Sequence, residues 1–453
     1  MTSNSILWLR RDLRRADHPA LVAAADNGPV AVLFVLDPSI FDPAGPVRQA
    51  WIARTLEATA AAYEGKLCVR LGDPAEVVPA VAAEIGARSV HVSTETEPDG
   101  SVRDRRVRDR LGELGVAWEE TGSPYAVTPG RVRNGEGGAH RVFSPFAKAW
   151  RNHGWRPPAE KPADLALLEL ESDPEAWERL TAAATAPGLP DLPPAGEDAA
   201  LHRWRTFLAD DLEAYAEDRN RPDLSATSRL SPYLKLGVVH PRTLLHDLAD
   251  HPGKGPAIFT NELAWREFYA DVLHHNPDSL WQDLNPALAQ MPYDEPEDLI
   301  QAWKNGRTGY PIVDAGMRQL LGSGWMHNRV RMITASFLCK HLHVWWPVGA
   351  RHFLQHLVDG DLASNNHGWQ WVAGTGTDAA PYFRIFNPML QGPKFDPEGA
   401  YVRRWIPELR HLEGRSAHEP WKNEQGYARG YSERIVDHAE ERKEALARYQ
   451  LTR

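Results

Sequence analysis

The sequence predicts an α/β N-terminal domain joined by a long connector to a large all-α domain. Three observations give this fold class. Residues 1–130 alternate short β-branched runs with Ala-rich amphipathic segments, which is the pattern of βαβ units with a parallel sheet. Residues 131–200 are rich in Pro and Ala, and residues 201–453 repeat apolar residues at the spacing of amphipathic helices. A chain of 453 residues can bury more than one sizeable core.

The α/β domain is expected to hold five strands with helices between them. The expected strands are residues 6–9, 30–36, 67–71, 89–92 and 116–119, and the expected helices include 48–63 and 74–85. Together they predict a Rossmann-like parallel sheet covered by helices. The glycine fingerprint GxGxxG is absent, so this domain gives no direct evidence for a bound nucleotide.

The connector, residues 131–200, contains the strings "RPPAEKP" and "APGLPDLPPAGED". Proline fixes φ and lacks a backbone N–H. We therefore expect this segment to resist regular structure and to lie over the surface.

The all-α domain, residues 201–453, is expected to form helices over 201–217, 258–274, 316–321, 330–342 and 348–357. At about 250 residues it is larger than a simple bundle requires, which favours a ligand buried in its middle.

Composition excludes several classes of protein. No apolar run approaches the roughly 18 residues that cross a bilayer, and no targeting signal is visible, so we expect a soluble, cytoplasmic protein without membrane contact. The two cysteines lie far apart and outside any CxxC unit, which argues against disulfides and thiolate metal sites. The net charge of −10 argues against indiscriminate binding of nucleic acid but allows a local basic patch.

Residues 360–392 crowd polar and aromatic side chains into one short segment. Asp359 and Asp361 flank Gly360, and Asn365 and Trp369 follow. Buried amides and carboxylates must find hydrogen-bond partners, so these residues either cap neighbouring helices or bind a polar ligand. The 17 tryptophans, 11 of them after residue 200, exceed what packing usually demands.

"TSRLSPYLKLG", residues 227–237, places hydroxyls and an arginine at the start of a helix. Such a helix start can bind a diphosphate through backbone N–H groups and the helix dipole. An ordinary N-cap is the simpler interpretation of this string alone.

"NELAWREFY", residues 261–269, sets Glu262, Trp265, Arg266 and Tyr269 on neighbouring helical turns. These side chains could grip a planar anionic ligand. The alternative is a solvent-facing salt bridge between Glu262 and Arg266.

"GWMHNRVRMITASFL", residues 324–338, carries a polar cluster at a helix entrance, although Met332 alone would suit a core. His341 and His343 lie two apart on a predicted helix and therefore point to different sides, which argues against a metal site.

These strings, with "GYPIVDAGMRQL" and "DGDLASNNHGWQWVAGTGTDAAPYFRIFNP", closely resemble the flavin-binding domain of the DNA photolyase and cryptochrome family, in the same order. The N-terminal "LWLRRDLRRADHPAL" is similar to the family's opening strand. "NNHGWQW" and "GTGTDAAPYFRIFNP" resemble the class I photolyases that split cyclobutane pyrimidine dimers. The resemblance implies an antenna domain over 1–130, a connector over 131–200, and a helical domain over 201–453 that holds FAD.

The resemblance also implies the cofactor site. Arg331 would pair with Asp359 beside the flavin ring, and Asn365 would face flavin N5. The residues that would hold FAD, active in its reduced form, are Tyr215, Thr227, Ser228, Arg229, Leu230, Ser231, Phe259, Arg266, Arg331, Asp359, Asp361 and Asn365.

The implied function is light-driven repair of pyrimidine dimers in double- or single-stranded DNA. The dimer would leave the base stack to reach the flavin. Glu262 and Asn365 would act in catalysis. A basic rim of Arg329, Lys394, Arg403 and Arg404 would bind flanking phosphates. The lesion-binding residues implied by the family are Glu262, Trp265, Asn328, Arg329, Met332 and Trp371.

In the family, a chain of aromatic residues carries electrons to oxidised flavin. The matching catalytic positions here are Trp369, Trp346 and Tyr293. Tyrosine stands where the family usually has tryptophan, and it is harder to oxidise unless its proton can leave. The outer step could instead use Trp303 or Trp345.

A cryptochrome-type photoreceptor, which binds FAD without repair, is the alternative function. Only about 48 residues follow Trp405, which leaves little for a signalling tail and favours the enzyme. A second chromophore, a deazaflavin or a folate, could bind near Arg10, Arg11, Glu95 and Glu97. A monomer is the simplest expectation.

Overall fold

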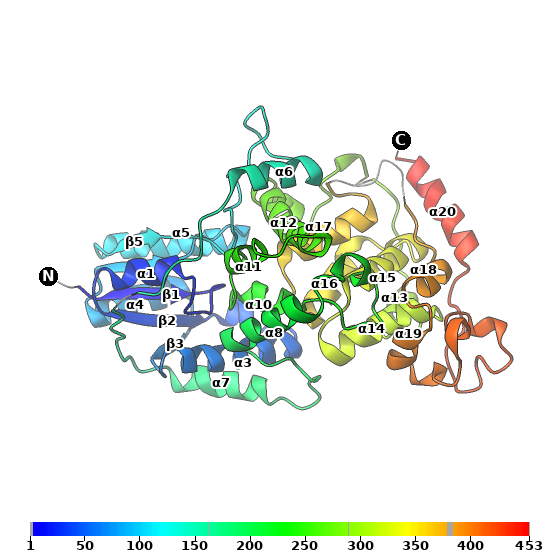
Figure 1. Ribbon diagram of the computed structural model, residues 1–453, viewed down its shortest axis with the longest axis horizontal. Coiled ribbons are helices and arrows are strands. Elements are labelled where there is room, and N and C mark those ends of the chain that lie inside the picture. The colour runs from blue at the N-terminus through cyan, green and yellow to red at the C-terminus, as the bar shows by residue number, and fades with distance from the viewer. Residues whose placement is uncertain (1–2, 163, 289, 378–383, 453) are drawn as a thin grey trace. The chain divides into compact units, whose positions relative to one another are not determined.

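The computed structural model describes residues 3–162, 164–288, 290–377 and 384–452 (Figure 1). These residues form two compact units. Unit 1 comprises Met1–Glu213 and Ser228–Pro277, and unit 2 comprises Ala214–Thr227 and Asp278–Arg453. The sequence-based boundaries at 130 and 200 are a different division of the chain and stay a prediction.

Unit 1 contains a five-stranded parallel sheet, as expected. Its order is β3-β2-β1-β4-β5, with β1 and β2 in register from the pair Ser5 and Val30 onward. Strands β2, β3 and β4 have the predicted bounds because turn residues lie close to their ends, whereas β1 and β5 differ by one residue. The strands are β1 Ser5–Leu9, β2 Val30–Leu36, β3 Leu67–Leu71, β4 Ser89–Val92 and β5 Ala117–Glu120.

Helices cover the sheet, with α5 along one side and α3 along the other in Figure 1. Helix α4 has the predicted bounds because clear signals mark both of its ends. The Asp73 side chain caps the helix at Pro74, and Gly86, in the left-handed conformation, ends it. The helices of this region are α1 Pro19–Ala25, α2 Pro38–Phe41, α3 Pro46–Ala62, α4 Pro74–Ile85 and α5 Pro98–Glu113.

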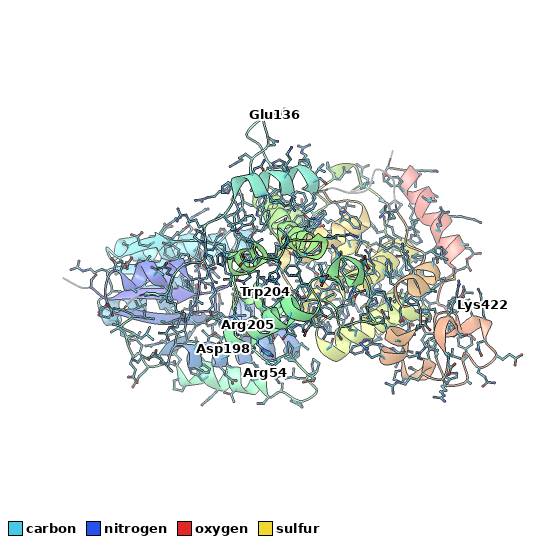
Figure 2. The ribbon with its side chains drawn as sticks, in the orientation of Figure 1. Arg54, Glu136, Asp198, Trp204, Arg205 and Lys422 are labelled. Carbon is cyan, nitrogen blue, oxygen red and sulfur yellow. The ribbon has the colours of Figure 1, made fainter. Side chains whose placement is uncertain are left out.

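The expectation that residues 131–200 resist regular structure is wrong. The segment contains α6, Phe143–His153, and α7, Pro174–Ala184, because most of its prolines lie outside these two stretches. Pro145 and Pro174 lie in the first turn of their helices, where the missing N–H removes no hydrogen bond of the helix. Helix α7 buries Ala176, Leu180 and Ala184 at a four-residue spacing, and Arg54 of α3 donates a hydrogen bond to its Ala184 carbonyl (3.0 Å; Figure 2).

The described residues that follow are mostly helical, which confirms the predicted fold class. Helices of unit 1 are α8 Glu197–Asp210, α10 Ser231–Leu236, α11 Pro241–Leu248 and α12 Lys254–His275. Helices of unit 2 are α9 Tyr215–Asp218, α13 Glu297–Lys304, α14 Pro311–Ser323, α15 Asn328–His341, α16 Trp346–His356, α17 Leu362–Ala373, α18 Pro388–Phe395, α19 Ala400–Trp405 and α20 His438–Gln450.

The core of unit 2 is built around indole rings. Trp303, Trp346 and Trp369 are all buried in one cluster with side chains of α14 to α17. Across the described residues, none of the helices combines the length and apolarity that crossing a bilayer requires.

Candidate functional site

The Arg331–Asp359 ion pair forms within unit 2. An Arg331 terminal nitrogen lies 2.8 Å from Asp359 Oδ2, and Arg331 Nε donates to the Met326 carbonyl (2.7 Å). The Asp359 residue is only 6% exposed. Its Oδ1 has no hydrogen-bond partner within the described part of the chain. A buried carboxylate oxygen of this kind can accept a hydrogen bond from a ligand or from water.

Much of the polar character of residues 360–370 is structural. Asp361 caps α17 by accepting a hydrogen bond from the Ser364 N–H (2.9 Å). Asn366 is fully buried and donates to the Leu280 carbonyl, and Gln370 donates to the Ser279 carbonyl (2.7 Å). This face of α17 therefore anchors the segment before α13, as the capping alternative predicted.

Asn365 points from α17 toward α16. Its side-chain amide donates to the Ala350 carbonyl (3.2 Å) and to Asn366 Oδ1 (2.9 Å). Both amide hydrogens have acceptors, so the orientation of the side chain is fixed. The predicted contact with flavin N5 is not tested by this geometry.

Trp369 is 3% exposed and packs edge-on against Phe353, with ring centroids 4.9 Å apart. Its ring centroid also lies 6.1 Å from the ring centroid of Trp303. Gly349 of α16 leaves room for the indole, because a Cβ there would lie 2.2 Å from Trp369 Cη2. The close packing of α16 on α17 therefore fixes the position of Trp369.

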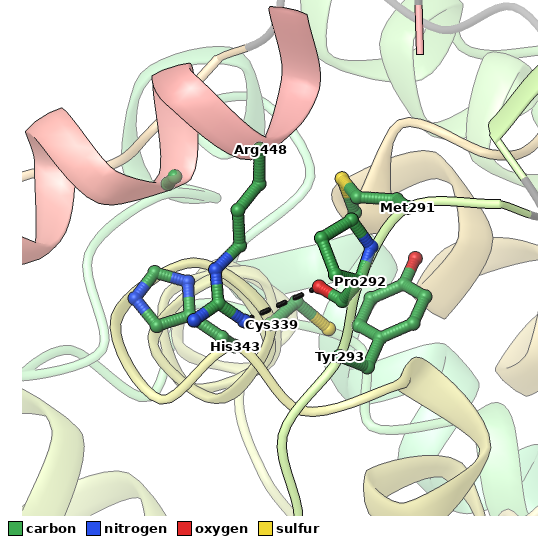
Figure 3. Close-up of a pocket in the computed structure, with 7 residues that line it drawn as sticks. Met291, Pro292, Tyr293, Cys339, His343 and Arg448 are labelled. Atoms are coloured by element: carbon green, nitrogen blue, oxygen red, sulfur yellow. Dashed lines mark hydrogen bonds between the residues drawn. The ribbon is translucent and has the colours of Figure 1, made fainter. Parts of the chain in front are cut away.

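Trp346 begins α16 and is fully buried. Its indole Nε1–H donates to Asp283 Oδ1 (2.7 Å). Tyr293 lies in a different environment, in a small pocket beside Cys339 and Arg448 (Figure 3). Burial raises the pKa of the Tyr293 hydroxyl, which has no hydrogen-bond partner among the described residues.

The N-terminal end of α15 gathers the other predicted residues of unit 2. Asn328 is exposed, and Arg329 donates to Asn220 Oδ1 (2.7 Å). The Arg329 guanidinium carbon lies 4.7 Å from the Phe395 ring centroid, and the Lys394 ammonium lies 5.2 Å from the same centroid. Met332, Trp371 and Phe386 are half-buried against the core of unit 2. Residues 378–383 of the motif "GTGTDAAPYFRIFNP" lie outside the described residues.

Unit 1 presents the second group of predicted residues on α12. Trp265 stacks face to face with Phe143 of α6, with ring centroids 3.7 Å apart and planes 7° apart. One face of the Trp265 ring is therefore covered by the chain itself. Phe259 packs with Phe207 and with Trp204 (Figure 2), at 5.0 and 5.4 Å between ring centroids.

Arg266 contacts neighbouring backbone. Its guanidinium donates to the Pro124 carbonyl (3.1 Å) and the Leu234 carbonyl (3.3 Å) and lies 4.5 Å from the Tyr125 ring centroid. These contacts tie α12 to two other segments of unit 1. They give Arg266 a structural role, and its contact with FAD stays a prediction.

Glu267 and Asp271, which anchor α12, were not predicted from the sequence. Glu267 accepts hydrogen bonds from the Val127 N–H (3.0 Å) and the Trp150 indole (2.5 Å), and Asp271 accepts one from the Gly130 N–H (2.7 Å). Burial raises the pKa of Glu267 to about 7. The signal was two carboxylates four residues apart on the apolar face of the helix.

The stretch 228–231 does not form the ordinary N-cap that its hydroxyls suggest. Helix α10 has only six residues, and its N-cap is Leu230, which makes no side-chain cap hydrogen bond. Ser228 Oγ accepts a weak hydrogen bond from the Leu230 N–H (3.4 Å). Arg229 takes a left-handed conformation, with φ of 51°, which is uncommon for a residue with a side chain. Thr227 and Tyr215 belong to unit 2, where Tyr215 is 7% exposed.

The residues expected around a second chromophore bind one another. Arg11 pairs with Glu97 (2.5 Å) and Glu95 (3.5 Å), and Arg10 pairs with Asp104 (2.7 Å). Burial raises the pKa of Glu95, but the surrounding arginines, Arg11 first among them, outweigh it and leave that pKa lowered. The network therefore holds Glu95 in the charged form.

Comparisons with known proteins identify the family of the chain. One family model, described as the FAD binding domain of DNA photolyase, matches residues 259–451, and another, described as DNA photolyase, matches residues 5–163. A deoxyribodipyrimidine photo-lyase of Halobacterium salinarum is 38% identical over 99% of both chains. The chain belongs to the DNA photolyase family.

Solved members of the DNA photolyase family share the fold over the whole chain. A bacterial class III photolyase from Agrobacterium tumefaciens is 35% identical, with a TM-score of 0.91 over 100% of this chain and 98% of that one. A cryptochrome from Synechocystis is 27% identical, with a TM-score of 0.88 over 99% of both chains. A photolyase and a cryptochrome thus share this fold, and the fold alone does not decide between them.

Proposed function

We propose that the protein repairs cyclobutane pyrimidine dimers in DNA in a light-driven reaction with reduced FAD, the activity of a deoxyribodipyrimidine photo-lyase. The observation that carries this proposal is the full-length similarity to a relative of that name. Bound FAD supplies the light-driven electron, and the protein binds, orients and shields the reactants.

The residues of unit 2 fit a flavin. The open Asp359 Oδ1 offers a buried acceptor, and the Arg331 guanidinium beside it adds a positive charge. Asn365 donates both amide hydrogens to the protein, and these two hydrogen bonds fix the orientation of its Oδ1. We assign FAD binding to Tyr215, Thr227, Ser228, Arg229, Leu230, Ser231, Phe259, Arg266, Arg331, Asp359, Asp361 and Asn365.

The left-handed Arg229 supports a functional stretch at 228–231. A non-glycine residue in this conformation costs of order 1 kcal/mol and persists where the surrounding structure requires it. The Arg203 Nε–H holds the preceding Ser228 carbonyl (2.9 Å). A left-handed residue in a turn is a conformation in which backbone N–H groups can bind phosphate oxygens, and we assign that role to this stretch.

A flipped-out dimer is bound by Glu262, Trp265, Asn328, Arg329, Met332 and Trp371. Since Phe143 covers one face of Trp265, the bases can use only the other face or the ring edge. The stacked Phe143 also stiffens the Trp265 ring, which lowers the entropy lost when a base packs on it.

The finer features are also proposals. The protein acts as a monomer in the cytoplasm on double- or single-stranded DNA, and its motifs resemble those of class I within the family. A deazaflavin or a folate serves as antenna in unit 1.

Illumination of the chemically reduced holoprotein with a dimer-containing oligonucleotide tests this function. We expect dimers to disappear under blue light and to persist in the dark. Equal dimer content in both samples would contradict repair and favour the cryptochrome alternative, which is supported by the solved Synechocystis relative.

A Glu262→Ala variant tests the lesion site separately from the cofactor site. We expect it to retain FAD, seen in the visible absorption spectrum, and to repair at least about tenfold more slowly, the loss for one transition-state contact of about 1.4 kcal/mol. The exposed Glu178 of α7, a helical glutamate of the same unit, provides the matched control, Glu178→Ala. Repair at the wild-type rate in Glu262→Ala would remove this residue from the lesion site.

A further inference from the structure

Two indoles contact Trp346, the middle residue of the aromatic series. Trp281 lies parallel to it, with centroids 6.4 Å apart and planes 3° apart. Trp345 lies at the same centroid distance with its plane inclined by 67°. Trp345 is 36% exposed, so its ring connects the buried Trp346 to solvent.

Trp346 is suited to carry a transient positive charge. Its Nε1–H donates to the Asp283 carboxylate at 2.7 Å, and a negative charge at that distance stabilises an electron-deficient indole. An electron lost from the interior can therefore be replaced through Trp346.

Tyr293 is unsuited to be the outer electron donor. A phenol that loses an electron must release its proton, and the Tyr293 hydroxyl is buried without an acceptor among the described residues. Burial also disfavours any charged form of the side chain. Arg448 of α20 holds the chain on both sides of Tyr293, donating to the Pro292 carbonyl (3.2 Å; Figure 3) and to Asp294 (2.8 Å).

The other two tryptophans near this path are also unsuited to be the outer electron donor. Trp303 is fully buried, and its indole N–H donates to the Thr334 carbonyl (3.0 Å). Trp281 has the Arg351 guanidinium carbon 4.6 Å from its ring centroid, and this positive charge opposes oxidation of the ring.

We propose that Trp345 is the surface end of the electron path that reduces the cofactor in light, and that Tyr293 lies outside this path. The inference rests on the proposed function, since it assumes bound FAD. One electron leaves Trp369 toward the photoexcited oxidised cofactor. Trp346, which follows Trp369 in the family's aromatic series and lies in the same core cluster, then reduces Trp369, and Trp345 reduces Trp346.

A soluble thiol reduces oxidised Trp345 and so completes the electron path. Oxidised Trp345 releases its indole proton to water, and a thiol then returns one hydrogen atom and becomes a thiyl radical. Two thiyl radicals couple to a disulfide, so two one-electron cycles oxidise two thiols. Solvent exposure of Trp345 permits both the proton release and the encounter with the thiol.

Trapping of the radical tests the proposal in the unmodified chain. The holoprotein with oxidised FAD is illuminated without thiol in the presence of a nitroso spin trap, digested, and mapped by mass spectrometry. We expect the light-dependent adduct on Trp345. An adduct on Tyr293 or Trp281 in its place would overturn the proposal.

Variants supply a second test, with dithiothreitol as the thiol and the spectrum of bound FAD as the readout. Trp345→Phe is expected to slow photoreduction about tenfold, which corresponds to a barrier higher by about 1.4 kcal/mol, while Tyr293→Phe stays within about twofold of the wild type. Trp118→Phe, which changes a half-exposed indole of β5, is the matched control.

Folding and repair are measured beside photoreduction. Bound FAD and the thermal unfolding midpoint show whether Trp345→Phe is folded, and the spin-trap result stands even if it is not. Wild-type rates in Trp345→Phe, or a slow Tyr293→Phe, would refute the path. Repair by chemically reduced wild-type protein reports on the proposed function alone. A failure of the repair function can therefore be distinguished from a failure of the electron path.

Discussion

Trp369 owes its position to the absence of a side chain at Gly349. A Cβ on Gly349 would lie 2.2 Å from Trp369 Cη2 and 2.6 Å from Leu338 Cδ2, which is closer than carbon atoms approach. Neither a buried indole nor a core leucine can move away without leaving its rotamer. A single glycine thus determines where the innermost tryptophan lies.

Gly349→Ala is predicted to destabilise the protein by about 1–3 kcal/mol, the usual cost of overpacking a core. It should also slow flavin photoreduction, because Trp369 must shift. Urea unfolding and the FAD spectrum under light measure the two effects.

The neighbouring Gly368 provides the control for this prediction. A Cβ there meets nothing within 4 Å, so Gly368→Ala should stabilise α17 by up to about 1 kcal/mol through helix propensity. If Gly349→Ala were equally harmless, the close contact with Trp369 would not constrain the ring.

At the level of secondary-structure elements, side chains of α20 contact side chains at the end of α15 and just after it, far away in sequence. His341 Nε2 lies 2.8 Å from His438 Nδ1, and His343 Nε2 lies 2.7 Å from Glu441 Oε2. Burial, with His438 and then His343 adding to it, lowers the pKa of His341 to about 3. His341 is therefore neutral in the folded protein.

This contact predicts a loss of stability in mild acid. The unfolded chain binds a proton at His341 when the pH falls below the ordinary pKa of about 6.5, whereas the folded protein binds it only when the pH approaches 3. The stability that is present above pH 6.5 is therefore lost as the pH falls. Between pH 7 and pH 5 this group should account for about 2 kcal/mol.

His341→Gln should remove that share of the pH dependence, measured as the difference between urea midpoints at pH 7 and pH 5. The comparison is between two pH values of one variant, so a general loss of packing cancels. An unchanged pH dependence in His341→Gln would contradict the assignment.

The elements were predicted from the sequence where local signals are complete. β2, β3, β4 and α4 have turn residues or caps close to their ends, which the sequence displays directly. Helices α6 and α7 were missed because prolines on either side dominated the composition of 131–200.

The site was predictable only in part. The strings of residues that carry it are visible in the sequence, and the Arg331–Asp359 pair was expected from them. The stacking of Phe143 on Trp265 and the burial of the Tyr293 hydroxyl depend on contacts between distant segments, which no local pattern encodes.

On the scale of the whole molecule, a net charge of −10 must be reconciled with binding to DNA. Lys394 and Arg329 meet at the ring of Phe395, and Arg404 donates to the Asp223 carbonyl (3.4 Å), in the same short segment that holds Asn220. Positive charge thus gathers locally in unit 2, which is what phosphate contacts require.

Lys394→Ala and Arg404→Ala are each predicted to weaken binding to damaged and undamaged DNA alike. Each should also reduce the magnitude of the slope of log K against log salt concentration by about one, the value for one lost phosphate contact. Binding isotherms at several salt concentrations measure this slope. Lys422→Ala (Figure 2) is the control, because its side chain is 65% exposed and pairs with Glu419. Equal slopes for all three variants would exclude the rim from DNA binding.

The route of the chain between its two units has a practical consequence. The backbone passes from one unit to the other after Glu213, after Thr227 and after Pro277. No single cut can therefore release either unit as a continuous fragment, and a truncated gene would leave one of them without part of its fold. Dissecting this protein into independently expressed halves would require rejoining distant segments with new linkers.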